Sequence, residues 1–291
     1  MTAIVQPDRR HIALWGVALA APNALYLTLV LLIPLGMVAT YSFFTYSTTG
    51  VALPVLTIAN YAKLGDPYFL RLIGRTVGIA VKTTIICIFL GYPLAYALAR
   101  ARPTLATLGF FLLLTPLMVS PVVRAIGWFV LLDRNGLVNS VLMYFGADRQ
   151  ELLFNEPAVL LGLSHLLLPF MVLPLVASIE RIPPNVEEAA RNLGAGGLGV
   201  FRKVILPLSL PGLVSGAVLV YVEAASAFVL PALLGGRFVR MIGNEVFDAL
   251  LVSYNIPQAS MLTVMLIVLT IGVLGTGLAL SRRGTVGRSA P

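Results

Sequence analysis

Residues 185–207 read NVEEAARNLGAGGLGVFRKVILP, a polar and basic segment between two long apolar runs. The whole chain of 291 residues is 58% hydrophobic and only 11% charged, and its mean hydropathy is +0.94. A soluble globule cannot bury so many apolar side chains, so the lipid bilayer must be the main solvent of this chain. The sequence therefore predicts an all-α integral membrane protein in which residues 185–207 are a polar exception.

Six apolar windows are each long enough for the roughly 20 residues that a membrane-spanning helix needs. Four windows contain interior prolines, which are tolerated where neighbouring helices or water satisfy the freed carbonyl groups. Kinked helices around a cavity are more typical of a transporter than of an inert anchor, and residues 1–291 are expected to form one transmembrane domain. The windows are residues 12–44, 76–99, 105–131, 158–179, 207–230 and 259–280.

Lysine and arginine residues in alternate loops predict the orientation of these spans. Eleven lie on the side that holds both termini and the loop 181–206, and seven lie on the other side. Both termini and this loop are therefore expected to be cytoplasmic. The outer loops are expected to include short interfacial helices, and the tail 282–291 is expected to be disordered.

The loop 181–206 contains signals for a short helix between the fourth and fifth spans. The prolines at 183–184 stop the preceding helix, Asn185 can cap a new one, and Glu188 completes a capping-box-like pattern. Gly194 can adopt the left-handed conformation that ends a helix. We therefore expect a helix over about residues 185–193.

The same loop resembles the EAA loop of bacterial ABC importer permeases. The matching residues are Glu188, Ala189, Ala190, Gly194, Leu206 and Pro207, with Val204 where that pattern usually has isoleucine. In that family this helix fits a groove on the nucleotide-binding subunit. The resemblance thus implies that these residues, with Glu187, couple a separate ATPase to movement of the spans. The alternative is a capped amphipathic connector without a partner.

The resemblance extends over nearly the whole chain. Residues 121–128, 132–139 and 228–236 look like the corresponding segments of spermidine/putrescine-type permeases. This implies a type I importer in the bacterial inner membrane, with two ATPase copies, a second homologous permease, and a periplasmic or lipid-anchored solute-binding protein. A polyamine is the expected solute. Opines, phosphonates and iron remain alternatives, as does a secondary transporter, which would need a coupling-ion site and commonly has inverted repeats.

No feature of the sequence predicts an enzyme, a cofactor or a metal site. The pattern G-x-x-x-x-G-K-[ST] is absent, so ATP must bind to another polypeptide. Residues 194–199 fit G-x-G-x-x-G, but a span follows them instead of a βαβ unit. The single Cys87 cannot form an intramolecular disulfide. His165 is expected to be a hydrogen-bonded packing residue, because no acidic residue is near it in sequence.

Three other ionisable residues fall within the predicted spans, where a charge is costly and therefore a candidate for function. Lys82 lies close enough to the outer end of its helix for its ammonium group to reach the interface. Arg124 and Glu223 both lie in the outer halves of their spans. Two hypotheses remain open: an ion pair between them holds spans three and five together, or Glu223 faces the translocation path and meets a cationic solute.

Overall fold

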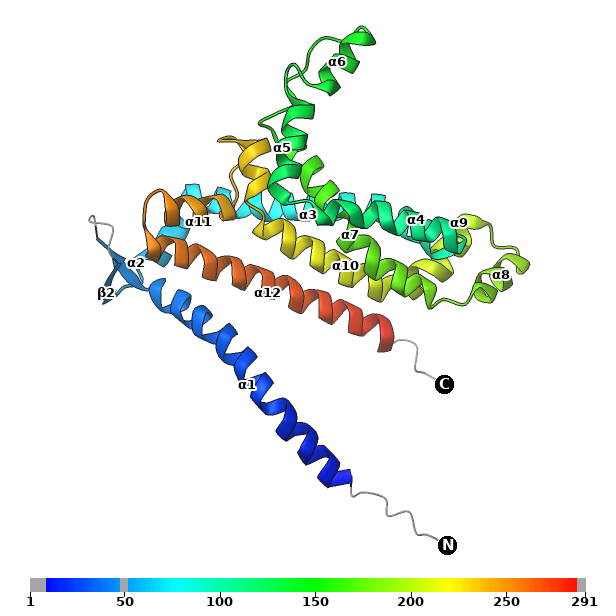
Figure 1. The fold of residues 1–291 in the computed structure, drawn as a ribbon, viewed down its shortest axis with the longest axis horizontal. Helices are drawn as coiled ribbons and strands as arrows, with labels where there is room; N and C mark the ends of the chain where they lie inside the picture. The colour runs from blue at the N-terminus through cyan, green and yellow to red at the C-terminus, as the bar shows by residue number, and fades with distance from the viewer. Residues whose placement is uncertain (1–8, 48–51, 287–291) are drawn as a thin grey trace.

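A computed structural model describes residues 9–47 and 52–286 of the chain and confirms the all-α membrane architecture (Figure 1). In these residues, five helical segments are long and apolar enough to cross a membrane, and a bent pair makes a sixth if it is one span. The principal helices are α1 (Arg9–Tyr41), α3 (Pro67–Arg100), α7 (Glu156–Glu180), α10 (Leu206–Ser226) and α12 (Ile256–Val286).

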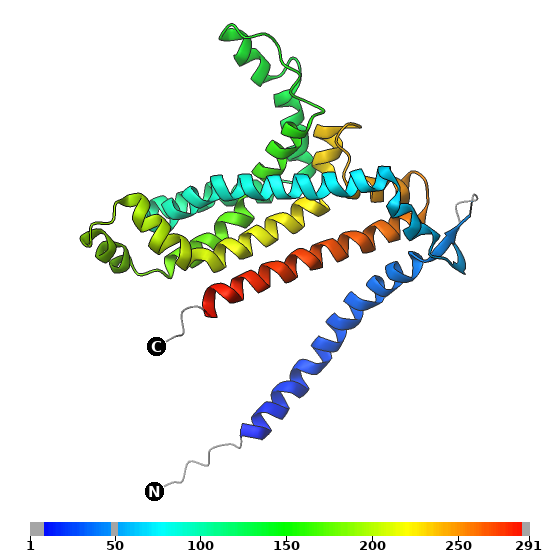
Figure 2. The same cartoon turned by 180° about the vertical axis from the view of Figure 1, so that it is seen from behind.

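The centre of the bundle is α7, which packs between α3 and α10, while α12 flanks α10 (Figures 1 and 2). Leu163, Met171, Leu175 and Ile179 recur on one side of α7 at helical spacing and are fully buried. Close contact between α7 and α10 depends on glycine: a Cβ atom on Gly216 would lie 3.0 Å from the carbonyl oxygen of Met171. The core therefore lies along the α3, α7 and α10 seam.

Helix α1 leans away from this bundle and approaches α12 only near one end (Figures 1 and 2). None of the most apolar window in Ala21–Tyr41 is buried, compared with 56% of that in Glu156–Glu180. The apolar side chains of Ala21–Tyr41 are therefore left to contact lipid or another chain.

The apolar window over residues 105–131, predicted as a span with interior prolines, is sharply bent. Two helical segments, 103–118 and 121–144, meet there at a bend of 98°. Pro116 and Pro121 lack the N–H groups that would continue a helix, and the linking residue Ser120 has ψ 138°. Its hydroxyl caps the next helix by accepting a hydrogen bond from the N–H of Val122 at 3.3 Å. The segments comprise α4 (Pro103–Leu114), η2 (Thr115–Met118), α5 (Pro121–Leu132) and α6 (Leu137–Tyr144).

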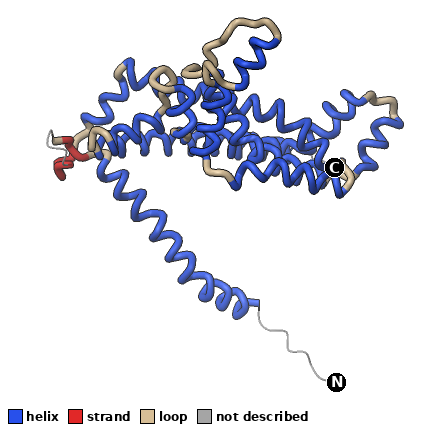
Figure 3. Tube along the Cα trace, turned by 45° about the horizontal axis from the view of Figure 1, so that its top comes forward, coloured by secondary structure: helices blue, strands red, loops and turns tan. Residues whose placement is uncertain are grey.

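The two ends of the bundle carry different short elements. One end, the α11 end, holds a two-stranded antiparallel hairpin that the sequence did not predict, as well as the expected short helices (Figure 3). Among the described residues, the opposite end, the α8 end, holds helical elements and turns. The α11 end includes β1 (Phe44–Tyr46), β2 (Ala52–Leu56), α2 (Ala59–Ala62), η1 (Lys63–Gly65), η4 (Pro231–Gly235) and α11 (Ile242–Leu251). The α8 end includes α8 (Pro184–Asn192), α9 (Gly197–Val200) and η3 (Phe201–Ile205).

Helices α1 and α12 both run from the α11 end toward the side of the molecule that holds α8, in opposite chain directions (Figure 1). The start of α1 and the end of α12 both point toward the side that holds α8 (Figure 1). Residues 282–286 belong to α12, so the expectation of a disordered tail is wrong for them. The rest of that tail, residues 287–291, lies outside the described residues.

Candidate functional site

Helix α8 extends beyond the ends of α7 and α10 (Figure 1). It begins at Pro184, and the preceding residue, Pro183, makes no side-chain capping bond. Proline suits the first helical position because its φ is already helical and its missing N–H group is not needed there. The helix therefore starts one residue earlier than predicted, and the expected capping role of Asn185 is wrong.

The end of α8 agrees with the sequence prediction. Gly194 has φ +87°, the left-handed conformation that side chains other than glycine rarely adopt. Its N–H group donates to the carbonyl oxygen of Arg191 at 2.9 Å, and that of Ala195 donates to the carbonyl oxygen of Ala190 at 3.0 Å. This pair of bonds is a Schellman motif, which satisfies the last carbonyl groups of the helix and turns the chain back toward α10.

The two neighbouring glutamates of α8 have different environments, because adjacent helical side chains point about 100° apart. Glu188 and Ala189 are exposed and Ala190 is half-buried. Glu187 is only 5% exposed. The residues that the sequence grouped together thus divide into an outward-facing set and one inward-facing carboxylate.

Glu187 is held by residues at the end of α3. Its Oε1 atom accepts hydrogen bonds from Arg100 Nη2 at 2.6 Å and from Arg100 Nε at 2.9 Å. Its Oε2 atom accepts one from the Tyr96 hydroxyl at 2.9 Å. Arg100 Nη2 also donates to the carbonyl oxygen of Ile182, at 2.9 Å, in the turn before α8. We call Glu187, Arg100 and Tyr96 the Glu187 clamp.

The return path from α8 to α10 also contacts α3. It includes η3, a single turn of π-helix, in which Phe201 packs edge-on against Tyr92 with ring centroids 5.0 Å apart. The Tyr92 hydroxyl is hydrogen-bonded to the Ser209 hydroxyl in α10. Leu206 and Pro207, which the sequence assigned to coupling, are half-buried at the start of α10. These contacts hold both arms of the loop close to the bundle.

In the described residues, Arg124 and Glu223 do not form the ion pair that was one of the two hypotheses for them. In the described part of the chain, Arg124 has no ion pair, and its Nε and Nη1 atoms are buried without a hydrogen-bond partner, while Glu223 is exposed. Lys82 instead pairs with Glu156 at the start of α7, with 2.6 Å between Nζ and Oε1. The expected packing role of His165 agrees with the hydrogen bond that its Nδ1 accepts from Trp128, at 3.3 Å.

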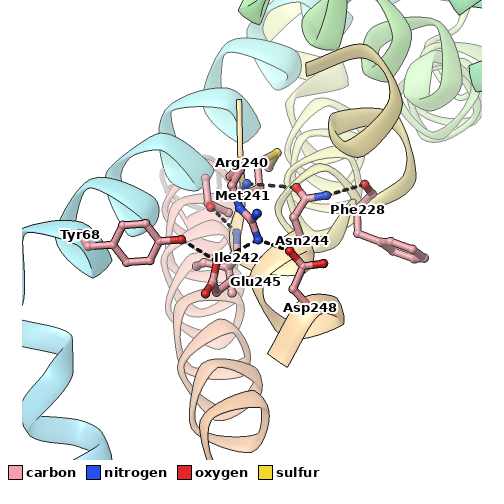
Figure 4. A network of polar contacts seen from close by, with 9 residues as sticks. Tyr68, Phe228, Arg240, Met241, Ile242, Asn244, Glu245 and Asp248 are labelled. Atoms are coloured by element: carbon pink, nitrogen blue, oxygen red, sulfur yellow. Dashed lines mark hydrogen bonds and ion pairs between the residues drawn. The ribbon is translucent and has the colours of Figure 1, made fainter. Parts of the chain in front are cut away.

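A second polar network lies at the α11 end and was not predicted from the sequence (Figure 4). Arg240 Nη2 lies 3.1 Å from Glu245 Oε2 and also bonds to Asp248. Burial alone lowers the pKa of Arg240, but the hydrogen bond to Asp248 and the two negative charges outweigh it and raise the pKa. The Tyr68 hydroxyl, at the start of α3, donates to Glu245 at 2.6 Å.

Further bonds of this network join α11 to its neighbours (Figure 4). The Asn244 side chain donates to the carbonyl oxygen of Phe228 at 2.8 Å, and the N–H group of Ile242 donates to the Thr76 hydroxyl of α3 at 2.9 Å. Helix α3 therefore takes part in polar networks at both ends of the bundle.

Comparisons with known proteins agree with this architecture. Residues 87–283 match the family described as binding-protein-dependent transport system inner membrane component. The chain is 35% identical over 246 residues to the spermidine/putrescine transport system permease protein PotB of Haemophilus influenzae, with 84% of this chain and 86% of that protein covered. It is 34% identical over 223 residues to PotB of Escherichia coli, with 76% of this chain and 81% of that protein covered.

Solved structures give the same fold. A chain of a bacterial ABC transporter involved in the import of the acidic polysaccharide alginate aligns with a TM-score of 0.74 and covers 95% of this chain and 97% of that chain. Sequence identity is 19%, so this likeness supports the fold alone.

Proposed function

Because this chain belongs to the family of binding-protein-dependent transport system inner membrane components, we propose that α8 docks on a separate ATPase and that the solute is a polyamine. The chain is a non-catalytic, multi-pass permease subunit of an ABC importer in the inner membrane. In the proposed assembly it forms half of the translocation path. Its partners are a second homologous permease, two ATPase copies and a periplasmic or lipid-anchored solute-binding protein.

The observation that carries the docking proposal is the outward-facing surface of α8. Glu188 and Ala189 are exposed on a short helix that is closed by the left-handed Gly194 and extends beyond the bundle. The small alanine leaves room for the close approach of another surface. The inward-facing Glu187 fixes which side of α8 is presented.

The charge distribution supports a cytoplasmic location for the α8 end, with both termini on that side. Basic residues are concentrated there, as the positive-inside rule requires. The start of α1 and the end of α12 point the same way as α8. The basic residues of the α8 end are Arg100, Arg102, Arg181, Arg191, Arg202 and Lys203. Labelling of single cysteines introduced on α8 and α11 with an impermeant reagent in intact cells tests this orientation: only the α11 position should react.

The docking proposal is tested by co-purification of the ATPase with two variants. Glu188→Lys reverses an exposed charge of α8, and Gly194→Val places a β-branched side chain at φ +87°. Both should lose bound ATPase or hydrolyse ATP without transport, while the solute-binding protein still docks. Glu180→Lys, with the same charge change at an exposed site outside α8, should retain both. Normal coupled uptake in both α8 variants would contradict the docking role.

The polyamine proposal is supported by the likeness to PotB over most of the chain and by Glu223. In the described part of the chain, this carboxylate has no ion pair and is exposed on α10. A cationic solute could therefore meet an unneutralised negative charge along the path. Calorimetry of the cognate solute-binding protein with putrescine, spermidine, an opine and a phosphonate decides the solute class. Binding of the phosphonate alone would exclude a polyamine.

A further inference from the structure

We propose that the Glu187 clamp transfers movement of α8 to α3, and that Glu187 and Tyr96 are positioning residues of the transport cycle. This inference rests on the proposed docking of an ATPase on α8. It goes beyond that docking because it assigns the route by which force leaves α8. The route is a set of side-chain bonds to a helix that is separated from α8 by more than 80 positions in the sequence.

The geometry of the clamp suits a connection that stays closed while its parts move. Glu187 receives three hydrogen bonds, two of them from one guanidinium group, and its side chain is 7% exposed. Charge-assisted bonds of this kind are stronger than neutral ones. Opening the clamp would leave a buried carboxylate without a partner, which is strongly unfavourable.

The Glu187 clamp holds the N-terminal end of α8. Arg100 bonds both to Glu187 in the first turn of α8 and to the carbonyl oxygen of Ile182 in the turn before it. In the described residues, the ion pairs at the α8 end all involve Glu187, the second being a 4.0 Å contact with Arg191 of α8 itself. A displacement of α8 by the docked ATPase is therefore transmitted to α3 through Arg100 and Tyr96.

Helix α3 can carry this movement to the other end of the bundle. It is one helix of 34 residues, which corresponds to about 50 Å at the usual rise per residue. Its opposite end contacts α11 through the Tyr68 hydroxyl and through the Thr76 hydroxyl, which accepts a bond from the N–H group of Ile242. The α8 and α11 ends are therefore joined by one continuous element with polar connections at both ends.

The alternative is that the clamp only keeps the loop folded. A purely structural role lowers assembly or stability, whereas a role in transfer lowers the number of solute molecules imported for each ATP hydrolysed. This ratio is measured on assembled transporters, so a loss of assembly does not alter it. Two variants probe it: Glu187→Gln keeps the side-chain size and removes the charge, and Tyr96→Phe removes one hydrogen bond.

The experiment uses the complete transporter in proteoliposomes that contain its solute-binding protein and radiolabelled putrescine, or the solute found by calorimetry. Glu187→Gln should assemble with the ATPase and hydrolyse ATP, but import about tenfold fewer molecules per ATP, in line with the loss of one charge-assisted bond. Tyr96→Phe should lower the ratio less. The matched control, Lys82→Gln combined with Glu156→Gln, removes a more exposed pair and should leave the ratio unchanged.

A wild-type ratio in assembled Glu187→Gln transporters would overturn the clamp's role and leave the docking proposal intact. If Glu187→Gln fails to assemble, Tyr96→Phe decides: a lowered ratio supports the proposal and an unchanged ratio overturns it. Failure of the wild-type chain to bind any ATPase would overturn both proposals, so the two failures are distinguishable.

Discussion

The α8 end and the α11 end each bring arginine and acidic side chains together, with opposite stoichiometry. At the α8 end one carboxylate, Glu187, receives Arg100 and lies near Arg191, whereas at the α11 end one arginine, Arg240, receives two carboxylates. The central charge is 7% exposed in the first network and 33% exposed in the second. Interactions that are shielded from water are less screened. We therefore expect the two networks to respond differently to substitution and to salt.

The largest effect is expected at the α8 end. Arg100→Ala leaves the carboxylate of Glu187 buried without its cation and removes the donor to Ile182. Breaking a buried pair in this way should lower the free energy of unfolding by about 3 kcal/mol. Thermal unfolding of the purified chain in detergent measures the change. A Tm equal to that of the wild type would show that the pair is not a stabilising contact.

A smaller effect is expected from backbone strain at the end of α8. Gly194→Ala places a Cβ atom at φ +87° and should destabilise the chain by about 1–2 kcal/mol. Gly197→Ala is the matched control, because Gly197 lies at the start of α9 and an added Cβ atom would meet no neighbouring atom within 4 Å. Thermal unfolding of the two variants under the same conditions separates the effect of backbone strain on stability from the effect of replacing any glycine by alanine. Equal stabilities would mean that α8 can end in another conformation.

At the α11 end a moderate effect that depends on salt is expected. Tyr68→Phe removes the hydroxyl that donates to Glu245 and should lower the free energy of unfolding by about 1 kcal/mol.

Arg240→Gln removes a charge on a side chain that is 33% exposed. The difference in unfolding free energy between this variant and the wild type should become smaller as the sodium chloride concentration rises. The Arg100→Ala difference should change little over the same range. Equal salt dependence at the two ends would remove the distinction between them.

The smallest effect is expected for the pair between α3 and α7. Lys82 is 57% exposed and Glu156 is 36% exposed, so their contact lies in the range of weak surface ion pairs. Substituting both by glutamine should change the unfolding free energy by less than about 1 kcal/mol. A larger loss of unfolding free energy, measured by the same thermal unfolding, would mean that this exposed pair stabilises the chain as strongly as the buried Glu187 clamp.

The sequence predicted those features that depend on local pattern. The five long helices follow from the length and apolarity of their windows, and the end of α8 follows from Gly194. The Glu187 clamp was missed because Tyr96 and Arg100 lie 91 and 87 positions from Glu187, and only their four-residue spacing on α3 marks them. Such a pairing requires the packing of helices, which periodicity within one segment does not supply.

Two features of the spans could not be predicted from the sequence, for related reasons. The apolarity of residues 105–131 predicted a span, but apolarity does not detect the bend that Pro116 and Pro121 impose. Similar depth in the membrane allowed two hypotheses, an ion pair between Arg124 and Glu223 or a Glu223 that faces the translocation path. Depth follows from residue counting, whereas the direction around the helix axis also decides contact, and Arg124 stays without an ion pair in the described residues.

The loose attachment of α1 bears on how the polypeptide enters the membrane during synthesis. A helix satisfies its own backbone hydrogen bonds, and the most apolar window of Ala21–Tyr41 has none of its residues buried by the rest of the chain. This segment leaves the ribosome before α3, α7, α10 and α12 and can insert before those helices exist. The central helix α7, whose window is 56% buried, packs against α3, which precedes it, and gains its contacts with α10 only after α10 has followed it.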